Sequence, residues 1–408
     1  MKKLFLIILL TACALSGCNT SSQKINEQTI NPTPSEKTEM TSPISEDPSS
    51  KSIRESTATA SIQSILDKKI EAVQTKNLDL YLSTITTADS YYWNEQKRWF
   101  TEMTKDGVRD LKYILREVTL EEGEIAIARV EQTHHYHQNF SISYPLRFIQ
   151  EEDEWKDAGY NFEEQKTERY TIKYMSGESK VTDFQKIIDT AYTNLASIFS
   201  EQPDPNFEIK LFHSRELLRQ RTIPTIGWLF TGWGEANESL KLYTGHPVLE
   251  PYYGTVQHEL VHHITMRICN NNLPGWIADG IALQYGNYAL EGGNAITLGY
   301  ATKDQVRVTV DFLENVDLWD AEKQEETWDW YNASQMLTEY IIESYGHDQL
   351  MALFYEAGKK PYNENVMNPK FNEQNNKTMG QVLQTVLGIT KEELTEAYWT
   401  WLDQTYPD

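Results

Sequence analysis

One stretch of the chain, His258-Glu259-x-x-His262, constrains the fold more than any other. Residues four apart on an α-helix project from the same face, so two imidazole groups at this spacing can converge on one cation. The apolar side chains around the motif recur with a helical period: Val256, Leu260, Val261, Ile264 and Ile268. The stretch 255–265 therefore predicts a buried, amphipathic helix that carries a metal site.

Glu259 directly follows the first histidine, which places it beside the predicted metal without requiring it to bind. This is the position of a general base for hydrolysis by a metal-activated water. We therefore assign Glu259 as the predicted catalytic base. A motif this short also arises by chance, so the rest of the chain has to supply corroboration.

The chain begins with Met1-Lys2-Lys3 and an apolar segment from Leu4 to Leu15, which is typical of a secretory signal and too short to span a bilayer comfortably. The segment ends at Leu15-Ser16-Gly17-Cys18, which resembles a bacterial lipobox. The resemblance implies a signal over residues 1–18, lipidation of Cys18 and an extracytoplasmic protein anchored to the bacterial cell membrane.

Two alternatives to Cys18 remain open. Leu10-Thr11-Ala12-Cys13 fits the lipobox loosely but leaves an unusually short apolar core, and an ordinary secretory signal would make Cys18 incidental. Processing at Cys18 would remove Cys13 and modify Cys18, which leaves Cys269 as the only free cysteine and excludes an intramolecular disulfide. We expect Cys269 to lie in the core or at a helix end.

Residues 19–59 are rich in Ser, Thr, Pro, Glu and Lys, and contain few large apolar side chains. Such a segment cannot bury enough apolar area to offset its ordering entropy, so we predict a disordered linker between the lipid and the folded part. The formal net charge of -23 argues against nucleic acid as a partner. A lipid anchor remains compatible with this charge because its attachment is hydrophobic.

About 350 residues follow the linker, more than one core usually holds, so we expect two domains. Over residues 60–165, two patterns of helical period precede alternating segments that predict strands at 111–115, 125–130, 140–144 and 146–149. Helices followed by antiparallel strands indicate an α+β domain. The order resembles the nuclear-transport-factor-2-like cone fold, which implies no particular chemistry.

The cluster His134-His135-Tyr136-His137 has two readings. In a strand His135 and His137 share a face and could form half of a metal site. No carboxylate or cysteine follows at a supporting spacing, however, so a polar or aromatic sheet face is the simpler reading.

Over residues 168–408, a strand at 170–174, a helix at 184–198 and a strand at 207–212 predict a mixed sheet with a helix packed across it. Further strands are expected at 227–234 and 239–243, ahead of the motif helix. Past a helix stop at 270–272, Trp276, Ile277, Ile281 and Leu283 indicate a second buried helix. Asp279 on that helix needs a partner, and a cation held by His258 and His262 would supply one.

The arrangement resembles the peptidase MA-like, gluzincin group of zinc metallopeptidases, whose second helix carries Trp-x-x-Glu-Gly with the glutamate as third zinc ligand. The matching segment here is Trp276-Ile277-Ala278-Asp279-Gly280, so the resemblance implies that Asp279, one methylene shorter, completes a zinc site. It also implies an edge strand before the metal helix that pairs with substrate backbone, and 240–243 is the expected edge.

The resemblance extends from about residue 168 to 402. The helix expected at 328–346 and the closing helices up to Leu402 are similar to those of the family, which implies that Tyr331 donates a hydrogen bond to the oxyanion of the reaction. Packing of Tyr331 in the core is the alternative. His263 points about 100 degrees away from His262, so we expect it in the core or next to the ligands. Three other histidines of this region have no supporting spacing: His213, His246 and His347.

These observations predict a lipid-anchored zinc metallopeptidase acting on peptide or protein substrates, in which His258, His262 and Asp279 hold Zn2+ and Glu259 is the base. The alternative from another class is a non-catalytic protein- or ligand-binding lipoprotein that retains a zincin scaffold. Hydrolysis of a non-peptide amide by the same site is not distinguished by the motif.

Overall fold

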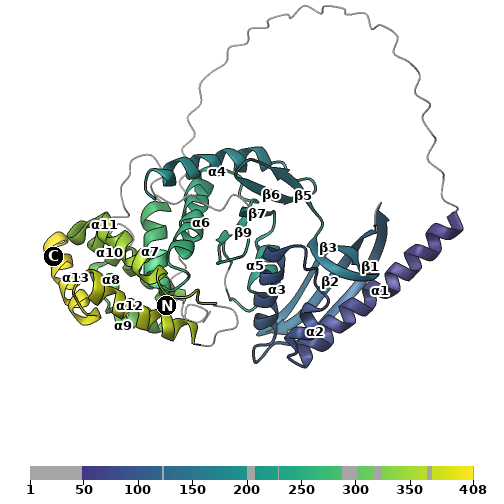
Figure 1. Cartoon of the computed structure of the whole chain (residues 1–408), viewed down its shortest axis with the longest axis horizontal. Coiled ribbons are helices and arrows are strands. Elements are labelled where there is room, and N and C mark those ends of the chain that lie inside the picture. Colours follow the sequence, from purple (N-terminus) through teal and green to yellow (C-terminus); the bar gives the residue numbers. More distant parts are fainter. Residues whose placement is uncertain are drawn as a thin grey trace, which may run out of the picture. The chain divides into compact units, whose positions relative to one another are not determined.

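The structure is a computed structural model that describes residues 48–121, 124–199, 207–227, 229–286, 301–316, 324–364 and 370–407. Cys18, the predicted signal and most of the predicted linker lie outside these residues. From Pro48 on, the chain forms one unit with two β-sheets followed by a mostly helical part (Figure 1). The fold class is therefore α+β, as predicted.

Three helices and an antiparallel meander form the first part of this unit. The helices are α1 (Pro48–Gln74), α2 (Leu78–Leu82) and α3 (Ser90–Met103). The four strands pair in sequence order as β1 (Arg109–Glu121), β2 (Ile125–Tyr136), β3 (Gln138–Glu151) and β4 (Glu154–Tyr160). Helix α1 packs on β1 and β4, which places it on one face of the sheet (Figure 1).

Two of these elements are longer than their sequence patterns predict. Helix α1 begins at Pro48, inside the segment expected to be a linker, because elongation of a nucleated helix adds one hydrogen bond per residue and proline suits the first turn. Strand β3 runs through Pro145, where two strands were expected. Strand β4 pairs with β3 only from Leu146 onward, and a bulge follows, so a residue without an N–H is tolerated there.

The second sheet is mixed and has the order β5-β6-β7-β9-β8. Its strands are β5 (Phe162–Lys166), β6 (Tyr170–Met175), β7 (Phe207–Phe212), β8 (Gly232–Trp233) and β9 (Leu240–Tyr243). Strands β6, β7 and β9 are parallel, and the two outer strands are antiparallel to their neighbours. Only Asn161 separates β4 from β5, so the chain passes from one sheet to the other without a linker.

The expectation that residues 240–243 form the edge of this sheet is wrong. Strand β9 lies between β7 and β8, and the edge next to it is the two-residue strand β8. Leu240 and Leu242 are buried, as befits an inner strand covered on both faces. The order of strands depends on non-local pairing, which the pattern along one strand does not encode.

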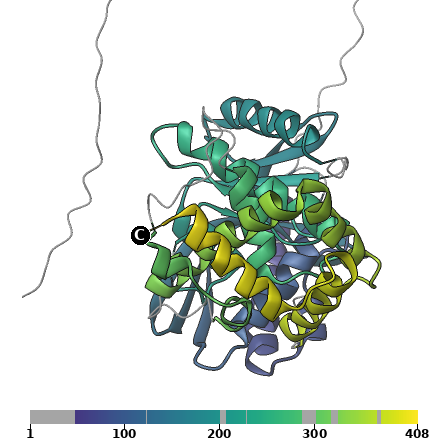
Figure 2. The same cartoon turned by 90° about the vertical axis from the view of Figure 1, so that its left-hand side faces the viewer.

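Helices dominate the chain after β9. They are α6 (Glu250–Ile268), α7 (Gly275–Gly286), α8 (Lys303–Val306), α9 (Val310–Asn315), α10 (Gln324–Tyr345), α11 (His347–Gly358), α12 (Phe371–Val386) and α13 (Lys391–Thr405). Figure 2 shows the C-terminal helices in yellow and yellow-green gathered on one side of the unit. None of the helices within the described ranges is long and apolar enough to cross a membrane.

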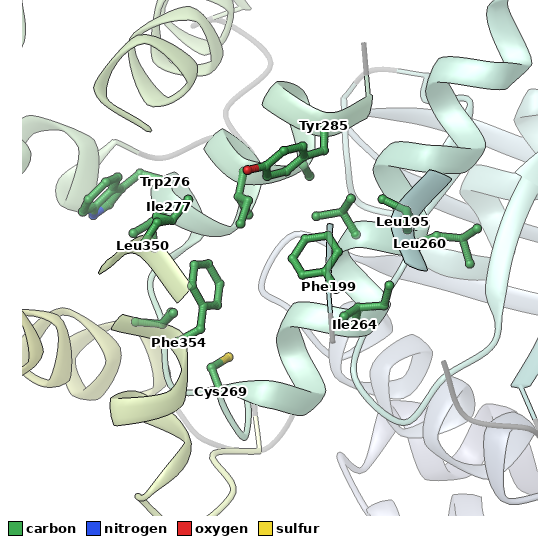
Figure 3. Close-up of a cluster of buried hydrophobic side chains, with 14 of the residues drawn as sticks. Leu195, Phe199, Leu260, Ile264, Cys269, Trp276, Ile277, Tyr285, Leu350 and Phe354 are labelled. Carbon is green, nitrogen blue, oxygen red and sulfur yellow. The ribbon is translucent and has the colours of Figure 1, made fainter. Parts of the chain in front are cut away.

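One hydrophobic core joins the second sheet to the helices. Helix α4 (Val181–Ala196) packs on α6, α6 on α7, and α7 on α10. Figure 3 shows Leu260 and Ile264 of α6 near Leu195 and Phe199, on the opposite side from Trp276 of α7. Each fully buried leucine or isoleucine stabilises this arrangement by about 1.5–3 kcal/mol.

A second core fills the space between the first sheet and its helices. It also takes in Leu217 and Leu218 of α5 (Arg215–Thr222) and Phe212 at the end of β7. Because residues from both sheets share this core, the two sheets are held together by apolar burial.

Candidate metal centre

The metal motif lies on α6, where the predicted apolar stripe is buried as expected. Val256, Leu260, Val261 and Ile264 have at most 1% of their surface exposed. The helix begins at Glu250 with Pro251 in its first turn and ends before Asn270 and Asn271, whose backbone is left-handed with φ of 50° and 57°. The predicted helix stop is therefore confirmed.

The turn between α6 and α7 is tied to the segment that follows α11. The Asn270 side chain donates to the Gly358 carbonyl at 2.7 Å, and the Asn272 side chain donates to the Pro361 carbonyl at 2.9 Å. Asn271 likewise donates to Asn363 at 2.9 Å. These amides satisfy carbonyls that would otherwise be unpaired and fix the angle at which α7 returns beside α6.

Helix α7 also packs closely on α10 because Gly280 has no side chain. A Cβ atom at Gly280 would lie 2.5 Å from the Ser334 carbonyl oxygen, so any larger residue would push the two helices apart. This contact sets the position of the preceding residue, Asp279, and brings α10 with Tyr331 to the same region.

The ligand atoms of His258, His262 and Asp279 converge. The two Nε2 atoms lie 3.1 Å apart, and Asp279 Oδ1 lies 3.3 Å from His262 Nε2 and 3.8 Å from His258 Nε2. All three ligand atoms fall within 4.8 Å of one another. Among the described residues, this is the one group of three such side chains that could hold a metal ion.

These separations fit a tetrahedral zinc ion. Two ligands that are each about 2.0–2.1 Å from zinc lie about 3.3 Å apart at a tetrahedral angle. Two histidines and one carboxylate also form a donor set that leaves a fourth position open. The side chain of Asp279, although shorter than that of glutamate, therefore reaches both histidines.

The charges of the site also fit a cation. Burial first, and then the neighbouring His262, lowers the pKa of His258 to about 3, which keeps its imidazole neutral and able to bind a metal. His258 also hydrogen-bonds to the Ala282 backbone, which orients the ring. Within the described part of the chain, the Asp279 carboxylate has no lysine or arginine within 4.0 Å.

The side chain of Glu259 lies against Gly232 and Gly234, at the edge of the second sheet. Its side chain is only 7% exposed, and burial, followed by the charges of Asp279 and Glu235, raises its pKa to about 7. A Cβ atom at Gly232 would lie 2.5 Å from Glu259 Oε1, and one at Gly234 would lie 3.1 Å from Oε2. The two glycines of this edge therefore make room for the carboxylate.

Tyr331 lies near the same centre. Burial raises the pKa of its hydroxyl well above the usual value, and the carboxylates of Asp279 and Glu259 raise it further. Its ring contacts Trp330 at 5.1 Å, edge to face. Tyr331 is half-buried, so it both packs on the core and faces the metal centre.

The other predicted candidates lie elsewhere. His263 packs on Phe207, with ring centroids 3.9 Å apart, and Cys269 is buried at the end of α6. In the other cluster, His134 is buried beside Phe140, and His137 lies in the turn after β2 with φ of 56°. Among the described residues, no group of three possible metal ligands includes these histidines.

Three residues of the site were not predicted from the sequence: Gly232, Gly234 and Glu235. The charge of Glu235 raises the pKa of both Glu259 and His262. The only local signal is the Gly-Trp-Gly segment at 232–234, whose small residues permit close approach of another element.

Comparison with known proteins adds no identification. No protein-family model matches the chain, and no curated protein sequence matches it.

Proposed function

We propose that the protein is a zinc metallopeptidase in which His258, His262 and Asp279 hold the metal and Glu259 is the general base. The observation that carries the proposal is the convergence of one carboxylate and two imidazoles within 4.8 Å, with a buried glutamate on the same helix. The zincin-like architecture of this region is part of the proposal, and the helix pair α6–α7 supports it.

Zinc bound at this centre would supply a Lewis acid that lowers the pKa of a water molecule and polarises the scissile carbonyl. Glu259 accepts a proton from the attacking water and later delivers it to the leaving amine. The burial of Glu259 on the helix that carries both histidines places its carboxylate for both steps.

The Tyr331 hydroxyl donates a hydrogen bond to the developing oxyanion. Its raised pKa keeps the hydroxyl protonated, so it remains a donor throughout the neutral range. Tyr331 interacts with both Asp279 and Glu259, so its hydroxyl can reach the reacting carbonyl.

Strand β8 provides the edge along which an extended substrate aligns. It is the last strand in the order of the second sheet, and no described strand pairs with its other side. A peptide in extended form can add to such an edge through main-chain hydrogen bonds. The proximity of Gly232 to Glu259 would place the peptide backbone beside the base.

The proposal includes attachment to the outer face of the bacterial cell membrane through a lipid on Cys18. It rests on the basic start, the apolar segment and the lipobox-like Leu15-Ser16-Gly17-Cys18. A Cys18→Ser variant should appear in the soluble fraction or remain unprocessed, and unchanged membrane attachment would exclude Cys18 as the anchor.

The test of the catalytic proposal combines metal analysis with digestion of a peptide library. The purified protein should contain about one zinc per chain and cleave peptides, whereas Glu259→Gln should retain the zinc and lose about 10³-fold in rate. Glu250→Gln, at the first residue of α6, serves as the control. Full cleavage by a zinc-loaded Glu259→Gln variant would refute the role of Glu259.

The same measurement distinguishes the alternative of a non-catalytic binding lipoprotein. Absence of zinc after purification in zinc-containing buffer, together with absence of cleavage, would favour that alternative. Zinc binding without peptide cleavage would direct attention to non-peptide amides.

A further inference from the structure

A polar cavity of about 440 Å³ lies between the first and second sheets, away from the metal centre. Its lining includes Tyr92 of α3, Tyr160 of β4 and Phe212 of β7. None of the proposed zinc ligands lines it, nor does Glu259. Its volume falls within the range of about 300–1,000 Å³ that small-molecule sites occupy.

The wall formed by the second sheet is charged but internally neutralised. Lys173 lies 2.5 Å from Glu208, and Lys210 lies 2.8 Å from Glu95. Lys241 lies 3.0 Å from Glu238, and Lys166 lies 3.6 Å from Glu164. Each ammonium group therefore already has a carboxylate, so this wall has no charge left to be balanced by a ligand.

The opposite wall carries a guanidinium group without such a partner. Arg221 of α5 is 5% exposed and lines the cavity. Two of its nitrogens donate to tyrosine hydroxyls, to Tyr144 at 3.2 Å and to Tyr92 at 3.5 Å, and the group lies 5.0 Å from the ring centroids of Tyr144 and Tyr160. Its Nε has no hydrogen-bond partner among the described residues. A buried guanidinium is always charged, so it requires an anion or several acceptors.

Asp157, the buried carboxylate that the Tyr92 hydroxyl links to Arg221, is already paired. Asp157 forms an ion pair with Lys69, and it accepts hydrogen bonds from the Tyr92 hydroxyl at 3.0 Å and from the Gly159 backbone at 2.8 Å. It meets Arg221 only through the Tyr92 hydroxyl. Two buried cations therefore share one carboxylate, which leaves an excess of positive charge beside the cavity.

Arg147 of β3 adds a second guanidinium to the lining. It is half-buried, and no carboxylate among the described residues lies within ion-pair distance of it or of Arg221. We propose that this cavity binds a small molecule bearing an oxyanion, a carboxylate or a phosphate, through Arg147 and Arg221. A planar guanidinium binds either group through two parallel hydrogen bonds, and the tyrosine and phenylalanine rings of the lining pack on the rest of the molecule.

Calorimetry on the purified full-length chain tests the proposal, with benzoate, its neutral isostere benzamide, and inorganic phosphate as probes at constant ionic strength. We expect benzoate or phosphate to bind and benzamide not to bind. Binding of benzoate alone identifies an organic acid site, and binding of phosphate alone identifies a phosphate site. Both results support an oxyanion site.

Two variants and one control locate the binding. Arg147→Gln should weaken the affinity about 10-fold or more, since one charge-assisted pair is lost. Arg221→Lys keeps the buried positive charge, which preserves the fold. It removes the pair of parallel N–H donors of the guanidinium, so it should also weaken binding. Arg129→Gln alters an exposed arginine on β2 that does not line the cavity, and should leave the affinity unchanged.

The proposal is overturned if none of the three probes binds to the folded protein. It is also overturned if benzamide binds as tightly as benzoate, or if Arg147→Gln and Arg221→Lys, both folded by circular dichroism, bind as the unchanged chain does.

Discussion

Two glutamates in this protein are buried to nearly the same extent, yet their pKa values are shifted in opposite directions. Glu259 at the metal centre is 7% exposed and has its pKa raised to about 7. Glu95 of α3 is 6% exposed, yet although burial alone would raise its pKa, the nearby Lys210 and Lys241 lower it to about 2. Because the two side chains are about equally buried, their charged neighbours account for the difference in pKa.

The comparison separates structural from functional ionisable groups. The carboxylate of Glu95 lies 2.8 Å from Lys210 and 3.3 Å from Lys241, and it accepts a hydrogen bond from the Ser239 hydroxyl. Among the described residues, Glu259 has no lysine or arginine in ion-pair contact. A buried acid without a lysine or arginine partner is poised to exchange a proton, whereas one paired with such residues stabilises the fold.

The largest effect that tests the comparison is expected from Glu95→Gln. Loss of one partner from a buried ion-pair cluster leaves charge uncompensated, so we expect a decrease of about 3–5 kcal/mol in the free energy of unfolding, measured by urea titration. Zinc content should not change. Glu154→Gln is the matched control, because Glu154 also lies 2.7 Å from a lysine but on the surface. An equal effect of both variants would contradict the distinction.

In the metal-free protein, the contribution of Glu259 to the pH dependence of stability should have the sign opposite to that of Glu95. The pKa of Glu259 rises from 4.5 to about 7 on folding, so the folded state binds more protons between these values and stability falls as pH rises from about 4.5 to 7. The loss from this group is about 3 kcal/mol. Glu259→Gln should remove this slope, as measured by urea unfolding at pH 5 and pH 8 with a chelator. An unchanged slope would show that another group titrates.

Tyr331→Phe should lower kcat about 100-fold, since one donor to the oxyanion is removed. Zinc content and stability should be retained, because the ring still packs on Trp330. Tyr355→Phe, which alters an exposed tyrosine of α11, is the control. A loss of zinc in Tyr331→Phe would indicate a structural role instead.

The smallest effect is expected at the edge strand. Gly232→Ala introduces a Cβ atom 2.5 Å from Glu259 Oε1 and should displace the base, lowering kcat/KM about 10-fold. Gly254→Ala is the matched control on α6, where the new Cβ meets nothing closer than 3.6 Å. If peptide cleavage by Gly232→Ala equals that of the control, the base does not depend on this strand.

Local features of the chain were predictable from the sequence. The stripe from Val256 to Ile264 and the spacing of His258 and His262 depend only on the helical period, and both are confirmed. Strand β7 has the predicted bounds, 207–212, and Gly346 ends α10 as expected. Such features follow from side-chain order within one element.

Contacts between residues on different helices and strands could be identified only from the tertiary structure. The approach of Asp279 to the histidines depends on the turn at Asn270–Asn272 and on the contact at Gly280. The replacement of β9 by β8 as the edge of the sheet, and the contact of Gly232 with Glu259, likewise depend on pairing between distant segments. No pattern along a single strand or helix specifies which neighbour it has.

By itself, the sequence determined the helix that presents the two histidines and the identity of the third candidate ligand. Only the tertiary structure decided that Glu259 has no lysine partner while Glu95 has two, because both are glutamates on helices and differ only in what packs against them. The ionisation of a buried acid depends on the charges brought beside it, and folding alone brings them there.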